Sequence, residues 1–244
     1  MATTPVNLAA TNVLSTSVRS TWERNPYSAA VLEDSPVAYW RLGEASGTTA
    51  VDFSGDGHDG AYETDVTLNQ PGLIAGSSDR AADFLPTTAG RMDASVGGNL
   101  GTSYTLEAWI IRNAAPTAHR VFMAAWASNS ERCGIFTDNT YTGELAYWDS
   151  NNKWKHSGFT LTPGVPYHVV VVVTGTEVKF YVNGAELTAL ALSQTPPSTF
   201  ANVTIGARSP DGGESATATI DEATIYDFAL SPDRIEAHYN AGTT

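Results

Sequence analysis

The sequence has little cysteine, few basic residues and no long apolar run. Cys133 is the single cysteine among 244 residues, so an intrachain disulfide framework is excluded. Its place at the start of a predicted strand is typical of a small buried side chain. The 13 lysines and arginines face 26 aspartates and glutamates, which gives a net charge of -13. Because nucleic acids and anionic membranes bind clustered basic residues, we expect neither as a partner.

Membrane-spanning and leader segments are not apparent either. The longest apolar run, Val169–Val173, has the length of a strand and is far shorter than a membrane span. Residues 1–8 contain no basic region followed by an apolar one, so we expect no secretory signal there. A signal peptide that had already been cleaved would leave the same sequence.

Patterns typical of catalysis are also missing. Asp221 and Glu222 are adjacent, so on a regular strand they face opposite sides and cannot form a glycosidase pair. Glu107 stands alone in its predicted strand and is expected to be an edge or hydrogen-bonded residue. The five histidines have no metal-ligand spacing, and no nucleophile turn or phosphate-binding glycine loop occurs. We expect no enzyme; a glycosidase with an atypical carboxylate pair is the weaker alternative.

From residue 35 onward the chain alternates between short strand-like segments and turns rich in Gly, Asp, Asn and Pro, which predicts a β-sandwich or barrel. The predicted strands are Val37–Leu42, Arg80–Phe84, Arg91–Asp93, Tyr104–Arg112, Arg120–Ala127, Cys133–Thr137, Glu144–Trp148, Trp154–Phe159, Tyr167–Thr174, Glu177–Val182, Asn202–Ile205 and Ala218–Tyr226.

Local signals refine this prediction. Gly175-Thr176 predicts a hairpin, and the following strand alternates, with Val178, Phe180 and Val182 on one face. The uninterrupted Val169–Val173 predicts a central strand covered on both faces. Ser231-Pro232 is typical of a helix start, so a short helix is expected near the C-terminus.

Residues 1–34 differ from the rest and are predicted to form an extended arm before a domain at 35–244. Thr, Ser, Asn and Ala dominate the arm, whose apolar residues are too scattered for a core of their own. Trp22 and Tyr27 are costly to leave in water. We therefore expect the arm to lie along the following domain or along a partner subunit, with an unstructured leader as the alternative.

The ten residues Val51–Gly60 hold three aspartates and three glycines. Glycine permits sharp turns that point carbonyl oxygens inward beside the carboxylates of Asp52 and Asp56. Such a loop suits a hard cation such as calcium. A solvated turn between two strands explains the same spacing equally well, and the EF-hand pattern is not matched.

Aromatic residues also occur in or beside loops rich in Asn, Asp and Ser. Sugars stack on exposed aromatic rings while neighbouring polar groups hydrogen-bond their hydroxyls. Tyr141, Trp148 and Trp154 are therefore the candidate glycan-binding residues, whereas Trp109 and Trp126 are interpreted as core residues.

Five motifs in order resemble laminin-G-like, concanavalin-A-like jelly-roll domains, over about residues 35–241. The resemblance implies an all-β, two-sheet antiparallel sandwich with an N-terminal arm and a short C-terminal helix. This fold serves lectins, glycosidases, adhesion domains and virion proteins alike. The motifs are PVAYWRLGE at 36–44, DFSGDG at 52–57, YTLEAW at 104–109, YVNGAEL at 181–187, and IDEATIY at 220–226 followed by ALS at 229–231.

The resemblance also implies a structural calcium, because in this family a metal often lies where the Asp-Ser-Gly loop meets a late strand. Carried over to this chain, the ligands are Asp52, Asp56 and Asp221, with backbone oxygens near Gly57 or His58. Asp56 stands where relatives often have Asn.

The junction at residues 27–44 is similar to laminin-G-like domains in virion proteins of tailed phages that infect actinobacteria, namely head-decoration and minor tail proteins. This implies a non-enzymatic virion surface protein, assembled in the host cytoplasm, with capsid or tail proteins as partners. Trp22 and Tyr27 in the arm would dock onto the particle, and a homo-oligomer, plausibly a trimer, is implied. The alternative is a carbohydrate-binding module of a secreted bacterial protein.

Overall fold

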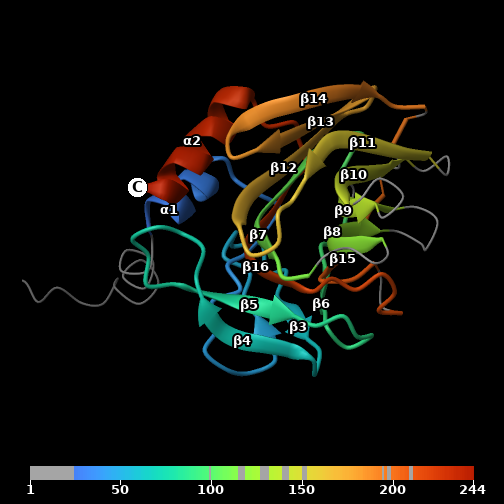
Figure 1. Ribbon diagram of the computed structural model, residues 1–244. Coiled ribbons are helices and arrows are strands. Elements are labelled where there is room, and N and C mark those ends of the chain that lie inside the picture. Colours follow the sequence, from blue (N-terminus) through green and yellow to red (C-terminus); the bar gives the residue numbers. More distant parts are fainter. Residues whose placement is uncertain are drawn as a thin grey trace, which may run out of the picture.

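The chain folds as a β-sandwich in the computed structural model, which describes residues 25–98, 100–114, 119–126, 132–138, 143–149, 153–193, 195–196, 199–208 and 211–244 (Figure 1). Trp22 and Tyr141 lie outside these residues. Within the described residues no helix is long and apolar enough to cross a membrane.

Two antiparallel sheets form the layers of the sandwich, which we call sheet A and sheet B. Sheet A runs in the order β14 (Ala185–Ala191), β13 (Glu177–Val182), β12 (Pro166–Thr174), β7 (Ser103–Arg112), β16 (Ala218–Tyr226), β5 (Arg80–Phe84) and β4 (Val66–Pro71), with β1 (Ala38–Trp40) also paired to β16. Sheet B runs β11 (Lys153–Thr160), β10 (Glu144–Asp149), β9 (Arg132–Asp138), β8 (Arg120–Trp126), β15 (Asn202–Ile205), β6 (Met92–Ser95), β3 (Gly60–Tyr62) and β2 (Thr49–Ala50).

The alternation of side chains along β12 shows how the sandwich is filled. Val169, Val171 and Val173 face the core between the two sheets, whereas Val170 and Val172 face outward from sheet A. All five are buried. The predicted central strand, covered on both faces, is therefore confirmed, as is its hairpin with β13, in which Val171 pairs with Phe180.

Two helices cover the outer face of sheet A (Figure 1). The predicted C-terminal helix is α2 (Pro232–Thr243), capped by the Ser231 side chain. The other helix, α1 (Pro26–Glu33), begins in the same way: Asn25 caps it and Pro26 occupies the first turn. It lies inside the predicted arm, so residues 25–34 pack on the domain.

Several strands escaped prediction, and they lie at sheet edges or ends. In β14 and β4 the exposed and partly buried residues alternate or mix, and neither strand has a fully buried residue. An edge strand packs little apolar surface, so its sequence carries a weak signal. The short β2 and β3 are of the same kind.

Candidate functional site

The side chain of Asp52 holds the loop at residues 51–60 together. The Oδ1 atom of Asp52 accepts hydrogen bonds from the backbone N–H groups of Tyr39 (3.0 Å) and Ser54 (2.9 Å). Its Oδ2 atom accepts from the Ser54 hydroxyl (2.7 Å) and the His58 N–H (2.9 Å). With four donors on one carboxylate, Asp52 braces the turn, as Asp side chains often do.

The remaining predicted calcium ligands are not brought to Asp52. The Asp56 side chain is exposed, and the His58 carbonyl accepts a hydrogen bond from the Trp40 indole at 2.8 Å. The Oδ2 atom of Asp221 accepts from the N–H of Leu73 at 2.8 Å. Among the described residues, no group of three or more His, Cys, Asp and Glu is placed to hold a metal ion. The predicted ligand set does not fit a calcium ion, and calcium binding itself stays a prediction.

A β-bulge in β16 corrects the prediction that Asp221 and Glu222 face opposite sides. The register with β7 shifts between Asp221 and Thr224, and Glu222 has a left-handed φ of 54°. Both carboxyl groups are consequently buried on the side of sheet A that carries Tyr39 and Arg41. The Tyr39 hydroxyl donates to Glu222 Oε2, and Arg41 Nε lies 3.8 Å from Glu222 Oε1.

Burial sets the protonation of this carboxyl pair. Burial raises the pKa of Glu222 to about 8, although the Arg41 guanidinium opposes the shift. Burial, followed by the repulsion of Glu222, raises the pKa of Asp221 well above its usual range. The pair therefore retains protons at neutral pH, which is a poor state for binding a metal cation.

Glu107 forms the centre of a second buried network, between sheet A and the two helices. Its carboxylate accepts hydrogen bonds from the Tyr27 hydroxyl (2.8 Å) and from Tyr226 (3.3 Å). It also lies 2.7 Å from His168 Nε2 and 3.1 Å from His238 Nδ1. Burial alone would raise the pKa of Glu107, but the two imidazoles lower it well below the usual range.

Tyr27 was predicted to dock onto a virion, but the structure places its side chain inside the domain. Tyr27 belongs to α1, and its side chain is fully buried, with its ring edge-on to that of Trp109 and the two centroids 6.1 Å apart. It is therefore part of the domain core and is not available to a partner.

The outer face of sheet B brings two predicted glycan-binding residues together. Trp148 on β10 and Trp154 on β11 are cross-strand partners, with ring centroids 4.7 Å apart at 75°. Both are half-buried and pack on Val121, Ala124 and Phe136. Both rings lie on the outer face of sheet B, and their binding of glycans stays a prediction.

A buried carboxylate orders two histidines beside this cluster. Asp138 lies 2.9 Å from His119 Nδ1 through Oδ1 and 2.6 Å from His156 Nε2 through Oδ2. The His119 ring stacks on Trp154, with centroids 4.9 Å apart at 20°. Sequence spacing missed this arrangement, because the three residues come from separate strands or segments.

A groove of about 590 Å³ lies farther across the same face. Trp126, half-buried at the end of β8, is its aromatic residue, and its indole N–H donates to Thr204 Oγ1 at 3.0 Å. The Thr204 hydroxyl donates in turn to Asp93 Oδ1 at 3.0 Å. The lining residues come from β2, β3, β6, β8 and β15 and the residue before β3: Thr49, Asp59, Gly60, Ala61, Asp93, Ala94, Ser95, Trp126 and Asn202.

The groove corrects the interpretation of Trp126 as a core residue. Ala125 faces the core between the sheets, so its neighbour faces outward. A bulge in β8 between Val121 and Met123 interrupts the alternation of inward and outward side chains. The sequence alone therefore does not show that Trp126 faces outward. The polar residues Asp93 and Asn202 could not be assigned to the groove from the sequence, because only the strand order places β15 beside β8 and β6 beside β15.

The comparisons with known proteins agree with this architecture. Residues 86–236 match the family model described as the concanavalin A-like lectin/glucanases superfamily. The chain belongs to this superfamily, and its lectin-like jelly-roll fold confirms the predicted resemblance to laminin-G-like and concanavalin-A-like domains. No curated protein matches the sequence.

Solved structures share the fold at low sequence identity. The botulinum neurotoxin serotype D ligand binding domain, in complex with N-acetylneuraminic acid, is 14% identical with a TM-score of 0.65, covering 88% of this chain and 52% of that one. A Trypanosoma rangeli sialidase is 13% identical with a TM-score of 0.62, covering 83% and 32%. The binding domain of Paraclostridial Mosquitocidal Protein 1 is 12% identical with a TM-score of 0.64, covering 86% and 52%. This chain thus spans about a third to a half of those proteins.

Proposed function

We propose that the protein is a non-enzymatic, lectin-like domain that binds glycans on the outer face of sheet B. The observation that carries the proposal is the 590 Å³ groove, in which the Trp126 indole lies beside carboxylate, amide and hydroxyl groups. An aromatic ring offers an apolar platform to a sugar ring, and the surrounding polar groups bond its hydroxyls. The lectin-like fold and the sugar named for one fold neighbour support the same class of ligand.

The charges in the groove favour a neutral glycan. The described residues of its lining include the carboxylates of Asp59 and Asp93 and no lysine or arginine, and Arg91 pairs with Asp93 at 2.7 Å from outside this lining. The whole chain carries a net charge of -13. An acidic sugar would find no charge partner among the described lining residues, whereas sugar hydroxyls can donate hydrogen bonds to the carboxylates.

A glycan array tests the proposal directly. We expect saturable binding of neutral glycans by the full chain, reduced about tenfold or more in Trp126→Ala because a stacking platform is lost. Phe228→Ala is the matched control, since Phe228 is an exposed aromatic residue outside the groove. A blank array, or equal losses in both variants, would contradict glycan binding in the groove. Turnover of any member of a polysaccharide panel would contradict the non-enzymatic part.

We further propose that the domain is displayed on a virion, as a capsid decoration or minor tail protein, and that it assembles as an oligomer such as a trimer. The support is the similarity of residues 27–44 to the junction in such proteins. Light scattering measures the oligomeric state, and co-sedimentation with particles measures association. A chain that stays monomeric and fails to bind particles would favour the alternative, a carbohydrate-binding module of a secreted bacterial protein.

A further inference from the structure

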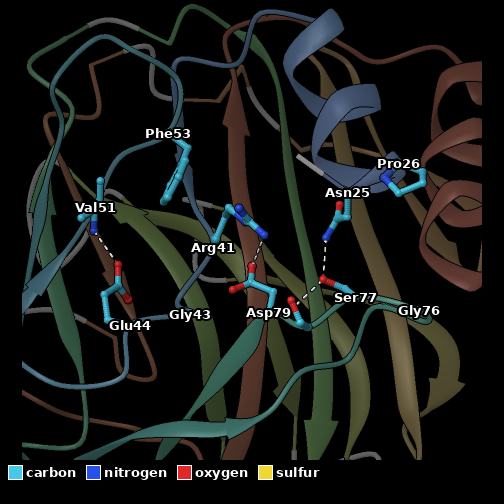
Figure 2. Close-up of a pocket in the computed structure, with 11 residues that line it drawn as sticks. Asn25, Pro26, Arg41, Gly43, Glu44, Val51, Phe53, Gly76, Ser77 and Asp79 are labelled. Carbon is cyan, nitrogen blue, oxygen red and sulfur yellow. Dashed lines mark hydrogen bonds and ion pairs between the residues drawn. The ribbon is translucent and has the colours of Figure 1, made fainter. Parts of the chain in front are cut away.

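A second cavity, of about 490 Å³, opens beside the start of α1, and none of its described lining residues also lines the groove. The segment at residues 49–53 separates the two, because Thr49 lines the groove whereas Val51 and Phe53 line the cavity. Figure 2 shows the cavity, lined by Asn25, Pro26, Arg41, Gly43, Glu44, Val51, Phe53, Gly76, Ser77, Ser78 and Asp79.

An ion pair between Arg41 and Asp79 lies at the centre of this lining (Figure 2). The Arg41 side chain is 8% exposed and that of Asp79 is 16% exposed. A Cβ atom at position 43 would overlap Asp79 Oδ1, so glycine there leaves room for the Asp79 carboxylate. The Asp79 N–H donates to the Ser77 hydroxyl oxygen at 3.0 Å, which fixes the loop that carries the carboxylate. The ion pair is thus held in one position.

The walls of the cavity combine apolar and polar groups. Phe53, Val51 and Pro26 supply apolar surface, and the Arg41 guanidinium carbon lies 5.2 Å from the centroid of the Phe53 ring. Ser77 and Asn25 add hydrogen-bonding groups, with Asn25 Nδ2 donating to Ser77 Oγ at 3.0 Å. Apolar walls with a few fixed polar groups are typical of small-molecule sites.

The charges restrict what such a site can hold. An anion would meet the carboxylate of Asp79, and a cation would meet the guanidinium of Arg41. Glu44, the third charged lining residue, already accepts hydrogen bonds from the Val51 N–H (2.9 Å) and the Tyr62 hydroxyl (2.7 Å). A neutral hydroxyl group is repelled by neither member of the ion pair, since it can donate to Asp79 and accept from Arg41.

We propose that this cavity is a second binding site, which holds a neutral, hydroxyl-rich group the size of one or two sugar rings against the Arg41–Asp79 ion pair. The volume of the cavity is within the range of ligand pockets, roughly 300–1,000 Å³. The site does not depend on the groove, because the two have separate linings and different polar groups.

Calorimetric titration of the full chain with D-glucose, D-galactose, D-mannose and N-acetyl-D-glucosamine tests the site. Cationic D-glucosamine and anionic N-acetylneuraminic acid serve as charged analogues. We expect at least one neutral sugar to bind, and the charged analogues to bind about tenfold more weakly or not at all. No binding of any neutral sugar, or tighter binding of a charged analogue, would overturn the proposal.

Two variants locate the bound sugar. Val51→Trp fills the cavity from its rim and should reduce affinity about tenfold or more, whereas Val165→Trp, at a similarly exposed valine elsewhere, should change it less than about twofold. Gly43→Ala should also reduce affinity by displacing Asp79, with circular dichroism checking that it folds. Trp126→Ala should leave this binding unchanged. If Trp126→Ala abolishes it and Val51→Trp does not, the sugar lies in the groove, and this second site is refuted while glycan binding by the groove stands.

Discussion

The outer faces of the two sheets are built in different ways. On sheet A, α1 and α2 cover a polar network centred on Glu107, and every member of that network is fully buried or nearly so. On sheet B, Trp126, Trp148 and Trp154 remain half-buried beside polar side chains. One face is thus a closed, buried layer, whereas the other presents half-buried aromatic rings, where we propose that glycans bind. Substitutions on sheet A should therefore change the free energy of unfolding, and those on sheet B should change affinity.

The largest change in the free energy of unfolding is expected from a substitution of Glu107. Replacing it in Glu107→Ala leaves His168 and His238 without their buried carboxylate partner, which typically costs about 3–5 kcal/mol. Urea unfolding measures the change. Glu236→Ala, at an exposed position of α2, is the control and should shift stability by less than about 0.5 kcal/mol. Equal stabilities of the two variants would show that the network does not stabilise the helix-covered face.

Stability should also fall as the pH rises. Folded Glu222 has a pKa of about 8 and holds its proton up to that pH, whereas the unfolded group releases it near its ordinary pKa of 4.5. The folded state therefore binds more protons between these values, and stability is lost by up to about 1.4 kcal/mol per pH unit. Thermal unfolding of Glu222→Gln from pH 5 to 8 should show a smaller slope than the parent chain. An unchanged slope would contradict this assignment.

The titration of His238 should also lower folding stability as the pH rises, over a narrower pH range. Burial alone would lower its pKa, but Glu107 and Asp34 raise it above 6.5. Its stabilising charge is therefore fully present below pH 6.5 and is lost as the pH rises through the raised value. Adding His238→Asn should reduce the slope that remains in Glu222→Gln above pH 6.5, and the buried Asp221, whose pKa is also raised, should keep part of it.

On sheet B, the two aromatic groups should differ in their effect on affinity. Trp154 is packed between His119 and Trp148, so less of its ring is free for a sugar than at Trp126. We expect Trp154→Ala to weaken glycan binding only about two- to threefold, against about tenfold for Trp126→Ala. An array titration that reversed this order would move the binding site to the Trp148–Trp154 pair.

The smallest effect is expected from calcium. Because Asp52 already accepts four hydrogen bonds, three from its own loop and one from Tyr39, thermal melts with calcium and with a chelator should differ by less than about one degree. A clear rise of Tm with calcium, abolished by Asp52→Ala, would restore the predicted metal site.

Much of the fold could be predicted because buried strands have a characteristic local sequence pattern. The run Val169–Val173 and the alternation from Val178 to Val182 specify which side of each strand is buried, and a Gly-containing turn specifies the hairpin. The start of α1 carried an equally clear signal. Asn25-Pro26 is an N-cap followed by proline, as is Ser231-Pro232. The composition of residues 1–34 instead led to the prediction of an extended arm.

The sites were harder to predict, because bulges and strand order set them. A bulge in β16 places Glu222 on the same side of sheet A as Asp221. A bulge in β8 changes the alternation of its side chains, and Trp126 faces outward as a result. Strand order alone brings Asp93 and Asn202 to the groove. The pair Trp148–Trp154 was accessible to prediction only because a short hairpin joins the two strands.

The position of α1 has a practical consequence for any shortened form of this chain. A truncation that starts at residue 25 keeps Tyr27 on Glu107 and the Arg234–Asp34 ion pair between the helices. A truncation that starts at residue 35 discards all of them and uncovers Trp109 and Val170, so an apolar patch of the domain's own core would face water. Aggregation of the shorter form would then report a broken fold rather than a lost partner, and the docking role of the N-terminal residues is best tested with the cut before Asn25.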